Sequence, residues 1–166
     1  MILGLPTAVY TFIHVVLSLA GIGSGFVFVY GLVIGKELNR WTALFLATTT
    51  LTSLTGFAYP FHGVTPGIVI GIFSMVVLAV AYLARYTLHL AGSWRWIYVV
   101  SAMLALYFNV FVLVVQSFER VPALKALAPT QSEPPFAIVQ LAVLALFITL
   151  TVRALRRFRP VAIPAI

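Results

Sequence analysis

The sequence predicts an all-α integral membrane protein: a bundle of five transmembrane helices with its N-terminus outside and its C-terminus in the cytoplasm. The chain is 63% hydrophobic and only 8% charged, whereas about a quarter of the residues in soluble domains are charged. Its apolar segments are long enough to cross a bilayer, and short polar turns separate most of them. We therefore expect a single transmembrane helical domain over residues 1–166.

The limits of the five helices follow from the residues that interrupt the apolar runs. Pro6 suits a first helical turn, where a missing N–H costs nothing, and a basic turn at 36–40 separates the first two helices. Pro60 and Pro66 break the chain before the third helix, and the four prolines between residues 122 and 135 are too many for a continuing helix. We expect the helices at residues 7–35, 41–60, 66–91, 94–118 and 136–157.

The positions of the basic residues agree with this helix count. Five spans place eight of the ten Lys and Arg residues on one side of the membrane. Cytoplasmic loops carry an excess of Lys and Arg, so this side is predicted to be the cytoplasm. The eight are Lys36, Arg40, Arg85, Arg95, Arg153, Arg156, Arg157 and Arg159, and the two on the outer side are Arg120 and Lys125.

Composition also restricts the classes of function. A net charge of +7 would suggest nucleic-acid binding in a soluble protein, but here the basic residues flank apolar runs and set topology. The chain has no Cys, which excludes disulfides, thiolate metal sites and thiol redox chemistry. It also has no Asp, and its three Glu residues lie outside the expected spans, so no catalytic residue is predicted.

Two polar or small-residue patterns occur inside the spans. Gly21 and Gly25 are four residues apart, and Gly31 and Gly35 repeat this spacing, which favours close helix packing over a phosphate-binding loop. The second helix contains five Thr and one Ser between residues 48 and 55. These hydroxyls either bond to preceding carbonyls of their own helix or line a polar cavity.

His14 is the clearest candidate for a functional residue, because an ionisable group within a membrane helix is costly. It lies six residues inside the first helix, roughly 9 Å below its outer end. His62 is the other imidazole expected on this side, so the two could flank a haem iron, with Arg120 or Lys125 near the propionates. Glu119 with both histidines would instead form a hard metal site, and a structural His bonded to a carbonyl or a Thr hydroxyl is a further possibility.

We therefore predict an outward-facing polar pocket between the first, second, fourth and fifth helices. Its expected cofactor-binding residues are His14, His62, Tyr59, Gln116, Gln140 and Arg120, and its ligand is a b-type haem or a quinone. The alternatives are a permease-like transporter that uses Asn109, Gln140 and the Thr-rich helix, or a non-catalytic accessory membrane subunit. Expected partners are the bilayer and a homo-oligomer or larger membrane complex, without nucleic acid.

Two stretches, LTSLTGFAYPF and NVFVLVVQSFERVPALKALAPTQSEPPF, resemble a group of small bacterial inner-membrane proteins without an assigned activity. The likeness covers most of the chain. It implies a multi-pass protein of the bacterial cytoplasmic membrane and implies no reaction.

Overall fold

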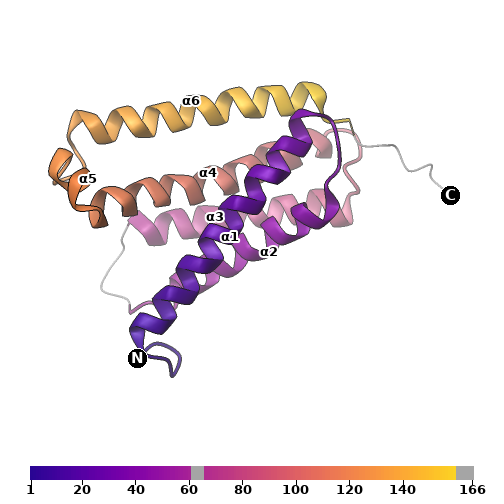
Figure 1. Ribbon diagram of the computed structural model, residues 1–166. Helices are drawn as coiled ribbons and strands as arrows, with labels where there is room; N and C mark the ends of the chain where they lie inside the picture. Colours follow the sequence, from indigo (N-terminus) through magenta and orange to yellow (C-terminus); the bar gives the residue numbers. More distant parts are fainter. Residues whose placement is uncertain (61–65, 160–166) are drawn as a thin grey trace.

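The computed structural model describes residues 1–60 and 66–159, and every named element in these ranges is a helix. Figure 1 shows long helices packed side by side, with α1 crossing the others obliquely and α6 lying along α4. The elements in chain order are α1 (Thr7–Val33), α2 (Asn39–Phe57), α3 (Pro66–Tyr82), the π-helical turn η1 (Leu83–Thr87), α4 (Trp94–Arg120), α5 (Pro122–Leu127) and α6 (Pro134–Arg157). An all-α fold was predicted, and the structure confirms it.

Four helical segments are long and apolar enough to cross a membrane: Thr7–Val33, Gly67–Thr87, Trp94–Arg120 and Pro134–Arg157. The protein is therefore a multi-pass membrane protein. The 19-residue α2 is the remaining long helix, and it is not among the four. Its hydroxyl side chains, together with Asn39 and Arg40 in its first turn, lower its hydropathy.

The second helix was expected at residues 41–60 and is observed as Asn39–Phe57. The expected and observed helices differ more in two other places. The third helix was expected to run to residue 91, but regular α-helix ends at Tyr82 and η1 follows. The amide of Leu88 bonds to the carbonyl of Leu83 at 3.0 Å, which is the spacing of a π-helix. The connection before α6 was expected to hold no helix, yet it contains α5, because Pro122 occupies the first helical turn, where proline is tolerated.

The hydrophobic core lies toward one end of the bundle, which we call the basic end: the end where α1 and α6 finish and α2 and α4 begin. Phe28 and Phe45 stack there with ring centroids 5.1 Å apart, and Tyr98 meets Phe28 edge-on at 6.1 Å. The buried residues of α1 run mostly from Gly21 to Leu32. The first half of α1 buries only Tyr10, so it is held mainly by polar contacts with α2, described below.

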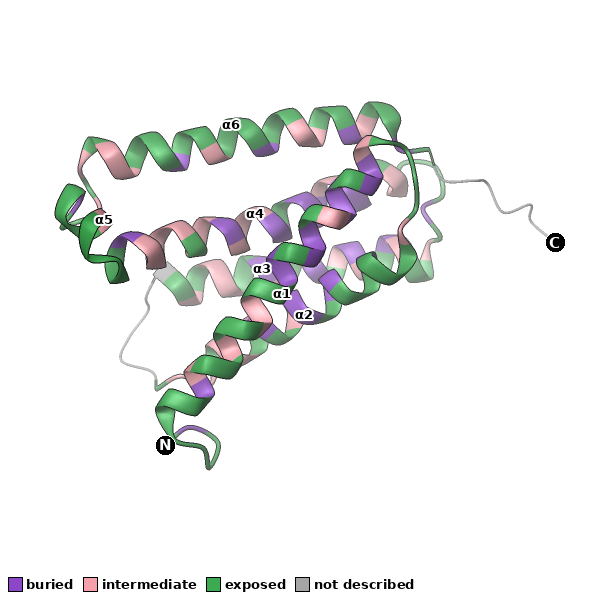
Figure 2. Ribbon diagram, viewed as in Figure 1, coloured by how far each residue is buried: buried purple, intermediate pink, exposed green. Residues whose placement is uncertain are grey.

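Helix α6 packs against the bundle through one narrow seam. Its buried residues are Gln140, Phe147 and Ala154, each seven residues from the next and so on one face of the helix. The rest of the helix is largely exposed, as the green ribbon of α6 shows (Figure 2). Exposed apolar side chains on such a helix are suited to contact with lipid or with another membrane helix.

Gly25 brings α1 close to its neighbours. A Cβ atom at this position would lie 2.4 Å from Leu106 Cδ1 on α4 and 3.0 Å from Phe45 Cδ2 on α2. At Gly21 the nearest atoms are Thr49 Oγ1 at 3.1 Å and Thr48 Oγ1 at 3.3 Å. These two glycines therefore serve helix packing within the chain, as their spacing predicted.

Replacing Gly25 with Leu should destabilise the protein, because a buried side chain would collide with Leu106 and Phe45, both fully buried. We expect a loss of about 1–3 kcal/mol, typical of overpacking, measured as a lower midpoint of thermal unfolding in detergent. Gly23→Leu is the matched control, because a Cβ at Gly23 meets nothing within 4 Å. Equal midpoints for the two variants would contradict this account of Gly25.

Candidate functional site

His14 belongs to a polar cluster that joins the first half of α1 to the end of α2. Its Nδ1 lies 2.8 Å from Thr55 Oγ1. The hydroxyl of Tyr10 donates to the backbone carbonyl of Thr55 at 2.7 Å. The hydroxyl of Tyr59 donates to Thr11 Oγ1 at 3.1 Å. Three hydrogen bonds between residues far apart in sequence thus hold the two helices together here, where little apolar surface is buried.

Tyr10 has a structural task that the helix geometry explains. Thr55 is in the last turn of α2, where carbonyl groups lack a full set of partners from their own helix. The Thr55 carbonyl accepts from the amide of Ala58 at 3.3 Å, and the Tyr10 hydroxyl adds a second, shorter hydrogen bond at 2.7 Å. Tyr10 thus ties α1 to the last turn of α2.

The contacts of Thr55 bear on the position of the proton on His14. A hydroxyl group has one hydrogen, and Thr55 Oγ1 has three acceptors within reach: the carbonyls of Leu51 at 2.7 Å and Thr52 at 3.1 Å, and His14 Nδ1 at 2.8 Å. If the hydrogen goes to a carbonyl, as in the other threonines of α2 that bond to their own helix, Thr55 Oγ1 accepts from His14. We therefore expect Nδ1 to be the protonated nitrogen of the neutral ring and Nε2 to carry a lone pair. No hydrogen bond to Nε2 is formed by the described residues 1–60 and 66–159.

The aromatic ring of Tyr59 lies against the imidazole on one side. The ring of Tyr59 meets His14 edge-on with centroids 5.6 Å apart, and it meets Tyr10 edge-on at 5.3 Å. On α2, Gly56 leaves space beside His14, since a Cβ there would lie 3.7 Å from His14 Cε1. His14, Thr55 and Tyr59 are all half-buried, so a ligand dissolved in the membrane could reach the ring.

The other predicted site residues lie in different contacts. Gln116 accepts a hydrogen bond from Arg120 Nε at 2.7 Å along α4. Gln140 on α6 donates to the carbonyl of Phe111 on α4 at 3.3 Å. No hydrogen bond or ring contact among the described residues joins these three side chains to His14 or Tyr59. The structure thus separates the contacts of His14 from two others, one within α4 at Gln116 and one between α6 and α4 at Gln140.

The second predicted haem ligand, His62, lies outside the described residues. Within residues 1–60 and 66–159, no group of three or more His, Asp or Glu side chains could hold a metal ion. Of the predicted site, the structure therefore places His14 and Tyr59 together and gives no position for His62.

The threonine-rich part of α2 uses its hydroxyls mostly within its own helix. Thr48, Thr50, Thr52 and Thr55 each donate to the carbonyl four residues earlier. Thr49 is the exception, because it accepts a hydrogen bond from Asn109 Nδ2 on α4 at 3.2 Å. The self-bonded, packed arrangement that the sequence allowed is the one that these four threonines adopt.

Gln140 leaves one polar atom without a partner. Its Oε1 is buried and makes no hydrogen bond with the described residues, although its amide nitrogen is bonded to Phe111. Gln131 makes a similar contact nearby, donating from Nε2 to the carbonyl of Val115 at 3.1 Å. Two amide side chains thus attach the α5–α6 region to the second half of α4.

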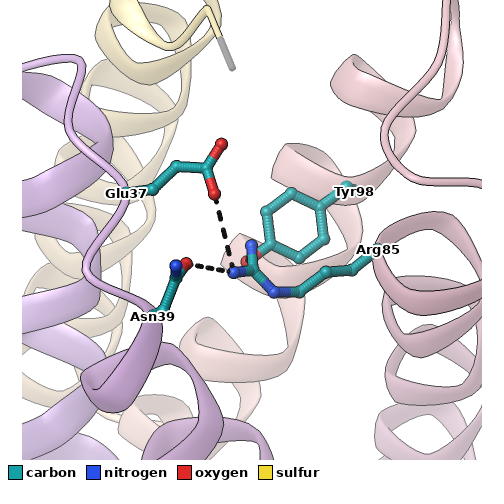
Figure 3. Close-up of polar contacts among 4 residues, drawn as sticks. All are labelled: Glu37, Asn39, Arg85 and Tyr98. Atoms are coloured by element: carbon teal, nitrogen blue, oxygen red, sulfur yellow. Dashed lines mark hydrogen bonds and ion pairs between the residues drawn. The ribbon is translucent and has the colours of Figure 1, made fainter. Parts of the chain in front are cut away.

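Arg85 forms a third polar cluster, at the basic end, which the sequence did not single out (Figure 3). Its guanidinium donates to Asn39 Oδ1 at 2.6 Å and to the Tyr98 hydroxyl at 3.3 Å, and it lies 3.8 Å from Glu37 Oε2. It also lies over the Tyr98 ring, 5.5 Å from the centroid. In the sequence, the one indication of this cluster was that Glu37 is the only acidic residue expected near the basic end.

Comparison of the chain with known protein families, curated proteins and solved structures finds no match. The function is therefore argued from these side chains alone.

Thr55→Val should release the His14 ring, because valine keeps the shape of threonine and removes the acceptor for Nδ1–H. We expect a mixture of the two neutral tautomers in place of one, read from nitrogen NMR of isotope-labelled histidine, with His14→Gln to assign the signal. Thr50→Val is the control, since Thr50 lies on the same helix and bonds to Leu46 and Tyr82. An unchanged His14 signal in Thr55→Val would refute the assigned tautomer.

Arg85→Gln should lower the thermal unfolding midpoint, because it removes the guanidinium group that contacts Asn39, Tyr98 and Glu37. Hydrogen bonds to charged groups contribute about 1.5–3 kcal/mol each when protected from water, and partial exposure of Glu37 reduces the ion-pair contribution. We expect a net loss of about 2 kcal/mol. Arg40→Gln, an exposed arginine at the same end, should leave the midpoint within error.

Proposed function

We propose that the protein is a small membrane subunit in which His14 contacts a membrane-soluble redox ligand, either a quinone or a b-type haem. The observation that supports this most directly is the fixed imidazole: Nδ1 is bonded to Thr55, and the Nε2 lone pair has no partner among the described residues. An oriented imidazole with one free nitrogen is costly to keep in a membrane helix unless it is used.

Both ligands fit this nitrogen. A quinol hydroxyl can donate to Nε2, and the half-buried ring of Tyr59, which meets His14 edge-on, offers aromatic surface for the quinone ring. A haem iron binds a neutral imidazole nitrogen, and the bond from Nδ1 to a hydroxyl is the kind of contact that orients such a ligand. For haem, His62 is the proposed second ligand, and Arg120 or Lys125 would face the propionates.

The proposed topology has five spans. Helix α2, with 19 residues, is about 28 Å long, close to the thickness of the hydrocarbon core at about 30 Å. Its polar hydroxyls are bonded within the helix, which lowers the cost of placing it in lipid. Five spans also collect eight basic residues on one side, favouring an outside N-terminus and a cytoplasmic C-terminus. The resemblance noted above points to the bacterial inner membrane.

Two alternatives have less support. A permease-like transporter needs a polar path, but Thr49 and Asn109 bond to each other and the other threonines bond to their own helix. An accessory subunit, working as a homo-oligomer or within a larger complex, is supported by the exposed apolar surface of α6. In that role His14 would serve only to join α1 to α2.

The test is to purify the protein from cells supplied with haem, record its oxidised and dithionite-reduced spectra, and extract bound quinone. We expect either a Soret band with a sharp reduced α-band, or quinone in near-equal amount to protein. His14→Ala should lower that content at least tenfold. His89→Asn is the control, because His89 is exposed at the basic end and its positive φ of 49° suits asparagine. A colourless protein without quinone would rule the proposal out.

A further inference from the structure

A cavity of about 730 Å³ opens at the basic end between the last turns of α1 and α6. Its lining residues are Val33, Ile34, Arg153, Arg156 and Arg157. The three arginines occupy positions i, i+3 and i+4 of α6, so they lie on one face of the helix. The wall formed by α1 is apolar. The cavity therefore has a strongly cationic side and a hydrophobic side.

The three guanidinium groups have no counter-charge within the described chain. None of them makes a hydrogen bond or an ion pair with residues 1–60 or 66–159. The chain has only three acidic residues, and Glu37 contacts Arg85 instead. Glu133 precedes the other end of α6, about 30 Å from Arg153 by helical rise, and Glu119 is also at that far end, in the last turn of α4.

Arg95 on α4 holds the end of α6 in place. It donates to the carbonyl of Leu155 in the last turn and to that of Phe158 just after the helix. Gly35 lies directly against the last turn, since a Cβ there would be 3.0 Å from the carbonyl oxygen of Arg157. The backbone is thus fixed in place, while the three side chains remain available to an external anion.

From this geometry we infer that the cavity binds the phosphate headgroup of an anionic phospholipid, with its glycerol and upper acyl region against Val33 and Ile34. Arginine forks match phosphate oxygens in a bidentate manner. The cavity lies at the C-terminal ends of α1 and α6, two helices that can span the bilayer. Lipid headgroups occur at the ends of such helices. The apolar wall favours a lipid over a free phosphate ion. This inference does not depend on His14, and in the proposed topology the site lies on the cytoplasmic side.

The experiment uses the full chain in detergent with added phosphatidylglycerol, cardiolipin or phosphatidylcholine, and native mass spectrometry counts the bound lipids. We expect selective retention of the two anionic lipids. A variant with Arg153→Gln, Arg156→Gln and Arg157→Gln should bind them about 100-fold more weakly, because each basic side chain near the headgroups strengthens binding several-fold. Circular dichroism would confirm that the variant stays helical.

The matched control removes three charges from the same end outside the cavity: Lys36→Gln, Arg40→Gln and Arg159→Gln. Loss of anionic-lipid binding in the cavity variant alone supports the site. Equal loss of binding in both variants would overturn it, since binding would then follow the total charge of the protein. A third arm adds inorganic phosphate to the lipid-bound protein at a concentration equal to that of the lipid. Displacement of the lipid by phosphate would also overturn the inference, because the site would then recognise a soluble anion.

Discussion

The close approach of α1 to α2 and α4 decides how the rest of the bundle is arranged. It is possible only because Gly21 and Gly25 present no side chain to Thr49, Phe45 and Leu106. Membrane helices gain little from hydrophobic burial against one another, so small residues that let backbones and side chains interlock supply much of the packing energy. Beyond this contact, toward residue 7, α1 buries almost no apolar surface. In this half of α1, the polar cluster around His14 therefore holds α1 against α2 in place of apolar packing.

Because polar contacts rather than packing hold the first half of α1, His14 can have a structural role and a functional one. Its Nδ1 contributes to the α1–α2 contact, and its Nε2 does not. A residue with only a structural purpose at this place would need one donor, and Ser, Thr or Tyr could supply it at lower cost in lipid. An imidazole brings a second nitrogen, whose lone pair can accept a proton or bind a metal.

The sequence predicted the elements that depend on local properties. The limits of α1 and α4 agree with prediction to within two residues, because uninterrupted apolar runs end at prolines or charges. The π-helical turn could not be predicted, since Arg85 in it bonds to Asn39, a residue 46 positions away. Helical rise alone led to the expectation that His14, Tyr59, Gln116 and Gln140 lie in the same outer half of the bundle. It could not predict how each helix is rotated about its axis, and in the structure the contacts of His14 are separate from those of Gln140.

The π-helical turn also has a consequence for chain length. A π turn holds one residue more than an α turn over the same rise, and one residue corresponds to about 100° of rotation around the axis. Deleting Leu83 or Ala84 would let ordinary α-helical bonding continue, and it would rotate Arg85 and the segment after it around the helix axis. Arg85 would then no longer face Tyr98 and Asn39. Homologous chains should therefore conserve the residue count of this stretch more strictly than its residue types, which makes an alignment gap there informative.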